Sequence, residues 1–259
     1  MTASPEFELL EALFAAAADR AAALFAGEPS IVCPHAEAVA TREGLDALAA
    51  AWPSTFGVEP GTAIEQRARH VAGGRAVSEA LVPVDGPNGA VTLPVAIIAD
   101  LAGEDRIAEA RVYYAERWVT GDTEIRTSPW PPGRYEQVVR PEDLDDVNAE
   151  YLAAVTAWDS DAIMRVFGSP CYVEFGPVRI EDRDAIRRMY EHFFGNELKL
   201  IFPTVTDDGR SCVVEWTTAG PEPRAAGITA YNRDASGRLG SIHMYDNFDP
   251  SSVPGLMPG

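Results

Sequence analysis

The chain has few of the residues that most readily define a function class. Among its 259 residues are three cysteines, four histidines and a single lysine, and the formal net charge is −19. Cysteines that are few and widely separated argue against a disulfide framework or a zinc knuckle, and they suit a reducing compartment such as the cytoplasm. The negative charge argues against nucleic acid or an anionic membrane surface as a partner, because phosphate groups attract lysine and arginine.

Sequence motifs for cofactors are missing as well. The four histidines show no paired spacing of metal ligands, and the chain has neither a glycine-rich phosphate loop nor a nucleophile elbow. The first 26 residues are rich in alanine and leucine but include five charged residues, so they predict an amphipathic helix and not a signal peptide or membrane span. We therefore expect chemistry that needs no metal and no organic cofactor.

What the chain does contain is a pattern of elements that occurs twice. An apolar fraction of 46% with 24% charged residues is typical of a globular protein. Residues 128–133, Ser-Pro-Trp-Pro-Pro-Gly, can neither continue a strand nor start a helix. On each side we expect helices, a short hairpin, a further helix and four consecutive strands. The sequence thus predicts an α+β fold with domains at 1–127 and 142–259, joined by a linker at 128–141.

The last strand expected in each half carries the clearest chemical signal. In residues 239–248, a period of two places Asp246 in an apolar row with Ile242, Met244 and Phe248. A carboxylate in such a row is costly unless it is protonated, hydrogen-bonded or functional. Shifting the first-half strand, residues 107–118, by 132 positions aligns Tyr114 with Asp246. Because the identity is low, the two strands share a pattern more than a sequence.

With these residues in view, each half resembles a nuclear-transport-factor-2-like domain of the branch that includes SnoaL-like polyketide cyclases and ketosteroid isomerases. The resemblance is clearest at residues 162–167, 172–176, 182–190 and 237–246, and looser at 41–52 and 105–114. It implies two tandem cone-shaped domains, each a curved antiparallel sheet wrapped around N-terminal helices. With two such domains in tandem, the chain also resembles fused epoxide-opening cyclases.

The resemblance implies a pocket with an acid/base residue on the last strand or the first hairpin. Asp246 fits the last-strand position, whereas Phe175 stands near the position of the isomerase base, with Glu174 beside it. We expect Asp246 and Glu174 to be the catalytic pair. Residues expected to bind or orient substrate are Tyr172, Tyr190, Trp216, His243 and Tyr245, of which the last two share the strand face opposite Asp246. Candidates in the first domain, expected to be degenerate, are His35, Glu79, Tyr114 and Glu116.

Three function hypotheses remain open from the sequence. The first is a cofactor-independent cyclase, epoxide-opening enzyme, isomerase or dehydratase acting on an apolar polyketide- or terpenoid-like molecule. The second is a non-catalytic small-molecule-binding or scaffold protein, and the third is an isomerase of the ketosteroid type. In each case we expect an apolar small molecule as the partner, and two halves that form a pseudo-dimer within the chain. Whether the chain also forms a homo-oligomer stays open.

Overall fold

The chain folds into two compact units, Met1–Glu124 and Ile125–Gly259. The computed structural model describes residues 4–33, 38–87, 89–123, 140–144, 146–195, 200–218 and 226–253. Most of the stretch expected as a linker, residues 128–141, lies outside these ranges. No helix within them is both long and apolar enough to cross a membrane. We describe each unit by itself.

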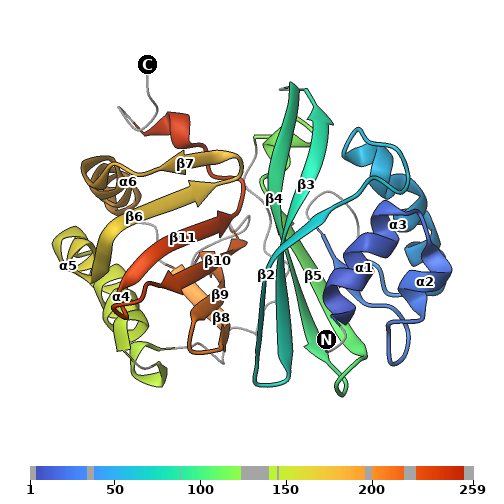
Figure 1. The fold of residues 1–259 in the computed structure, drawn as a ribbon, viewed down its shortest axis with the longest axis horizontal. Helices are drawn as coiled ribbons and strands as arrows, with labels where there is room; N and C mark the ends of the chain where they lie inside the picture. Colours follow the sequence, from blue (N-terminus) through green and yellow to red (C-terminus); the bar gives the residue numbers. More distant parts are fainter. Residues whose placement is uncertain are drawn as a thin grey trace. The chain divides into compact units, whose positions relative to one another are not determined.

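The first unit places three helices and a short strand before four long strands (Figure 1). Its elements are α1 (Pro5–Phe14), α2 (Ala18–Ala22), β1 (Ile31–Val32), α3 (Arg42–Thr55), β2 (Glu65–Ala72), β3 (Arg75–Gly86), β4 (Gly89–Leu101), β5 (Ile107–Tyr114) and the 3-10 turn η1 (Glu116–Trp118).

The second unit repeats this order and adds one hairpin strand. Its elements are η3 (Pro141–Asp143), α4 (Asp146–Thr156), α5 (Ser160–Val166), β6 (Phe167–Phe175), β7 (Val178–Ile180), α6 (Arg183–Gly195), β8 (Leu200–Asp207), β9 (Ser211–Thr218), β10 (Ala226–Arg233), β11 (Leu239–Tyr245) and η4 (Pro250–Ser252).

Each unit contains one mixed sheet, not the purely antiparallel sheet that we expected. The order is β1-β5-β4-β3-β2 in the first unit and β7-β6-β11-β10-β9-β8 in the second. The exceptions to antiparallel pairing are β1 with β5 and β6 with β11, which are parallel. The reason is topological: the first strand of each unit joins the sheet beside the last strand and runs in the same direction, whereas the four later strands form a meander.

The hydrogen-bond registers show that the duplication extends to individual residues. In the first unit Ala99 pairs with Ala110, and in the second Tyr231 pairs with Ile242, each 132 positions further along the chain. Ile97 with Val112 and Thr229 with Met244 keep the same spacing. The shift of 132 positions deduced from the last strands therefore also holds for β4 and β10, the strands directly before them.

Helices cover one face of each sheet, which we call the inner face; the opposite face is the outer face (Figure 1). In the first unit α1 packs against β3, β4 and β5. Helix α3 begins where the Thr41 hydroxyl accepts the Gly44 amide N–H at 3.1 Å. The proline pattern predicts an end at Pro53, but the helix continues past this residue to Thr55. The expected helix over residues 5–26 is interrupted at Ala16, whose φ of 52° is left-handed.

Candidate active site

The inner face of the second sheet carries Asp246 at its rim. Trp216 belongs to the buried core formed with the helices, and it pairs with Gly227 on β10. A Cβ atom added to Gly227 would lie 2.7 Å from the Trp216 ring and 2.8 Å from the Cβ of Asp246. Both side chains therefore lie over this glycine, on the same face. Asp246 is 4% exposed, so its carboxyl group is held inside the unit.

One carboxylate oxygen of Asp246 accepts a hydrogen bond that closes a turn just beyond β11. Its Oδ1 accepts the backbone N–H of Phe248 at 2.8 Å. The Phe248 ring lies 5.1 Å from that of Phe175 and 4.7 Å from that of Phe193 on α6, measured between centroids. Aromatic rings thus surround the chain directly after Asp246, and the turn fixes the direction of its side chain.

Three tyrosines form a second polar group on the same face. The hydroxyls of Tyr151 on α4 and Tyr190 on α6 are 2.8 Å apart. Tyr231 on β10 packs against Tyr151 with ring centroids 4.6 Å apart and ring planes at 48° to each other. Burial raises the pKa of all three phenols. They stay protonated at neutral pH, so they act as hydrogen-bond donors and not as bases.

Sequence reasoning singled out Tyr190 but missed Tyr151 and Tyr231. Both were read only as apolar positions on a helix face and in a strand. The available signal was chemical: a tyrosine in an apolar row brings a hydroxyl that must find a partner when it is buried. That the three side chains meet depends on how α4, α6 and β10 pack together.

The structure separates the two carboxylates that we expected to act as a pair. In the parallel pairing of β6 with β11, Glu174 lies beside His243, and Val173 beside Ile242. Neighbouring residues in a sheet share a face, and Val173 and Ile242 are in the inner core. Glu174 is therefore on the outer face, whereas Asp246 is on the inner face. The separation follows from this register together with the alternation of side chains along each strand.

Tyr172, His243 and Tyr245 also lie on the outer face, by the same register. The Tyr172 hydroxyl is 3.1 Å from Nε2 of His243, and the two rings stack at 26°. The guanidinium of Arg179 lies 3.5 Å from the centroid of the Tyr172 ring. These residues form a local polar cluster of their own. Of the residues expected to contact substrate, the inner face holds Tyr190 and Trp216.

In the first unit, aromatic side chains fill the space around the position equivalent to Asp246. That position is Tyr114, which is fully buried. Its ring lies 5.1 Å from Phe56 and 6.4 Å from Trp52, and Phe14 packs against both at 5.0 and 6.1 Å. Matching registers make the following residues equivalent: Asp246 and Tyr114, Thr229 and Ile97, Tyr231 and Ala99, Trp216 and Ala80.

The other first-unit candidates do not gather at Tyr114. Glu79 pairs with Ala96 next to Tyr113, which places it on the outer face, and its Oε1 is 2.8 Å from Nε2 of His70. Glu116 is buried, but it lies in the 3-10 turn after β5 and not in a strand. His35 lies outside the described residues. Within the described ranges, no three histidine, cysteine or acidic side chains are grouped so that they could hold a metal ion.

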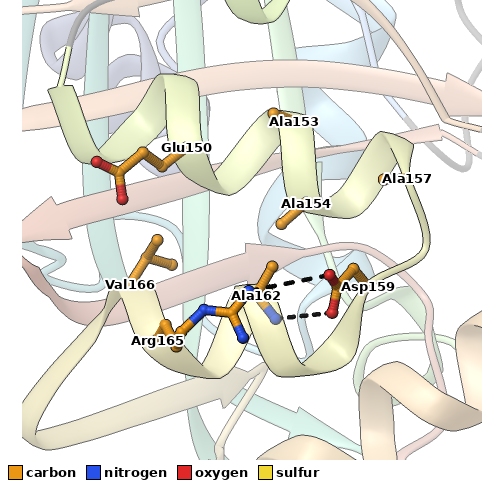
Figure 2. A pocket seen from close by; sticks show the side chains of 8 residues that line it. All are labelled: Glu150, Ala153, Ala154, Ala157, Asp159, Ala162, Arg165 and Val166. Carbon is orange, nitrogen blue, oxygen red and sulfur yellow. Dashed lines mark hydrogen bonds and ion pairs between the residues drawn. The ribbon is translucent and has the colours of Figure 1, made fainter.

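A groove of about 370 Å³ lies between α4 and α5 (Figure 2). Alanine side chains form much of it. Asp159 lies 3.9 Å from Arg165 and also accepts the backbone N–H of Ala162 at 2.8 Å, as expected for the residue that caps α5. Asp159 and Arg165 thus have structural partners, and nothing among the described residues of the groove indicates a ligand.

The fold and this interior define a class: an α+β domain in which a sheet and three helices enclose a buried carboxyl group and several hydroxyls. Residues 149–239 match the family model of the SnoaL-like domain. The second unit therefore contains a SnoaL-like domain. The match includes Tyr151, Tyr190, Trp216 and Tyr231, and ends before Asp246.

Solved structures with similarity to parts of the chain belong to the same group of folds. A candidate polyketide cyclase from Sinorhizobium meliloti is 20% identical, over 41% of this chain and 99% of its own, with a TM-score of 0.35. The epoxide hydrolase/cyclase-like enzyme SalBIII, which has a role in pyran ring formation in salinomycin, is 20% identical over 39% and 87%, with a TM-score of 0.35. A protein with a ketosteroid-isomerase-like fold from Catenulispora acidiphila is 19% identical over 46% and 91%, with a TM-score of 0.38. No curated protein sequence matches the chain.

Proposed function

We propose that the second unit is a cofactor-independent acid/base enzyme that acts on an apolar, polyketide- or terpenoid-like molecule. The observation that carries this proposal is Asp246, a carboxyl group held 4% exposed at the rim of an aromatic interior. A carboxylate in such surroundings is costly for folding, and it is well suited to accept or deliver a proton at carbon or oxygen. Asp246 is thus our general acid or base.

The tyrosine hydroxyls supply the complementary group. Hydrogen-bond donors directed at an oxygen on which negative charge develops stabilise the transition state of proton transfer next to a carbonyl or of ring opening. Tyr151, Tyr190 and Tyr231 remain protonated, which keeps them donors. Gly227, which lies under Asp246, and Tyr231 are four positions apart on β10, so about 13 Å of strand lies between them. A substrate that contacts both ends is therefore an extended or multi-ring molecule.

The second unit is the better candidate for the active site because its interior is polar where the first is apolar. The positions of Asp246, Thr229, Tyr231 and Trp216 are occupied by tyrosine, isoleucine and two alanines in the first unit. Packing of the same fold does not need the polar residues, since the first unit folds without them. Their presence in the second unit is best explained by chemistry or by binding.

Asp246 also supports a second candidate function, a protein that binds a small molecule without converting it. Its Oδ1 accepts a backbone N–H, which is the bond expected of a carboxylate with a structural role. In that case the hydroxyls and aromatic rings would select a ligand, and the carboxyl group would hold the turn after β11.

Asp246→Asn distinguishes the two functions. We would measure binding and turnover of epoxides, polyketide-like enones and steroid enones, after thermal melts show that the variant folds. If Asp246 is the acid or base, the variant retains binding and loses about 10²–10⁴-fold in rate. Glu174→Gln, a carboxylate change on the outer face of the same sheet, should retain most of the rate. Equal binding by wild type and Asp246→Asn with turnover by neither would favour the binding protein and exclude the enzyme for this panel.

A further inference from the structure

The inner face of the second sheet contains a buried hydroxyl, that of Thr229, which no expectation from the sequence included. Thr229 on β10 is 1% exposed and lies between Val214 and Met244 in the sheet. Its Oγ1 accepts the indole N–H of Trp216 at 3.1 Å. Tyr231 lies two residues further along the same strand face. The threonine thus holds the indole beside Asp246 and lies on the strand between that indole and the three tyrosines.

We propose that Thr229 is the positioning residue of this site: by accepting the indole N–H of Trp216, it fixes the wall against which Asp246 lies. The indole has a single N–H, so one acceptor is enough to fix the orientation of the ring. Gly227 provides the other half of the arrangement, because any side chain there would meet the indole at 2.7 Å. The inference rests on the proposed function in so far as it concerns catalysis.

The first unit supports a functional reason for this hydroxyl. Ile97 stands at the equivalent position and pairs with Val112, as Thr229 pairs with Met244. A β-branched apolar residue is therefore compatible with the fold at this point of the sheet. Ala80 replaces Trp216 in the same unit, so the indole and its acceptor are absent together. The threonine and the indole thus occur together in the second unit, and the equivalent positions of the first unit have neither.

The test compares Thr229→Val with Thr229→Ser in the full chain. The two changes keep a β-branched shape and a hydroxyl, respectively. The first readout is the indole N–H resonance of Trp216, assigned by its loss in Trp216→Phe. We expect it to move upfield in Thr229→Val and to stay in place in Thr229→Ser. The second readout is kcat/KM on the best panel compound, which should fall about tenfold in Thr229→Val, the value of one hydrogen bond, and recover in Thr229→Ser.

Thr206→Val is a matched control for removing a buried threonine hydroxyl. Thr206 is 1% exposed on β8 of the same sheet, and its hydroxyl has no hydrogen-bond partner among the described residues. The change should alter neither readout. Thr229→Ala provides a second variant if Thr229→Val does not fold. It also removes the acceptor of the indole N–H, so the indole resonance should move upfield and kcat/KM should fall.

An unmoved indole resonance in Thr229→Val, or a loss of rate that Thr229→Ser fails to recover, overturns the positioning role. If Thr229→Val does not fold, an indole resonance that stays in place in Thr229→Ala, or an unchanged rate, overturns it instead. If the wild type converts no panel compound, the proposed enzyme function fails for that panel. The indole resonance still decides whether Thr229 holds Trp216, because it requires no turnover. The two failures are therefore distinguishable.

Discussion

At the scale of single residues, the second unit shows how one glycine organises a site. Gly227 lies on a strand, where a residue without a side chain weakens the sheet. The space that it leaves is occupied by the Trp216 ring and by Asp246, both within 3 Å of where a Cβ would be. The glycine therefore lets an indole lie flat on the backbone next to a carboxyl group.

Gly227→Ala should overpack this point. We expect a loss of about 1–3 kcal/mol in the free energy of unfolding, because the indole and Asp246 must move to admit a methyl group. The rate should fall with it. Urea unfolding measures the first effect. Gly27→Ala is the control, since a Cβ at that exposed glycine meets no atom within 4 Å. Equal stability of Gly227→Ala and wild type would show that Trp216 does not lie over the glycine.

At the scale of elements, charged side chains join neighbouring strands of the first sheet. Asp100 on β4 binds Arg75 on β3 and Arg111 on β5, at 2.8 Å in each case. Arg111 is 1% exposed and also binds Glu109 at 2.6 Å. Burial alone would raise the pKa of Asp100, but the two guanidinium groups more than offset this, so its pKa lies below the usual value.

This shift predicts the direction of a pH effect. A carboxyl group with a lower pKa in the folded than in the unfolded chain stabilises the fold above the unfolded value of 3.8, and this contribution is lost as the pH falls through the folded value. Asp100→Asn should cost about 1 kcal/mol at pH 7 and make melting temperature less dependent on pH below about 5. Asp105→Asn, in the exposed loop before β5, should leave the curve unchanged. If the melting temperature of Asp100→Asn falls with acid as steeply as that of the wild type, the prediction is wrong.

At the scale of the molecule, the two units share a topology and differ in their interiors. The first has a cluster of four aromatic side chains, Phe14, Trp52, Phe56 and Tyr114, whereas the second has hydroxyls and a carboxyl group on the corresponding face. One copy of a duplicated domain can lose its pocket without losing its fold, because rings that fill the interior also stabilise it. How the halves associate stays a prediction.

We therefore predict one binding site per chain. Calorimetric titration with the panel compound of highest affinity should give a stoichiometry of one, and Asp246→Asn should keep that value. Tyr114→Phe should change neither stoichiometry nor rate, because it alters only the first interior. A measured stoichiometry of two, or loss of binding in Tyr114→Phe, would assign a site to the first unit as well.

Sequence alone determined the properties that depend on neighbours along the chain. These are the order of elements, the duplication with its shift of 132 positions, and the place of Asp246 in the inner row, all of which follow from strand alternation and from proline and glycine turns. The tertiary structure decided what depends on contacts between distant segments. The parallel register of β6 and β11 put Glu174 on the outer face, and the packing of α4 and α6 on β10 brought three tyrosines together. Periodicity assigns a side chain to a face, but only packing chooses its partners.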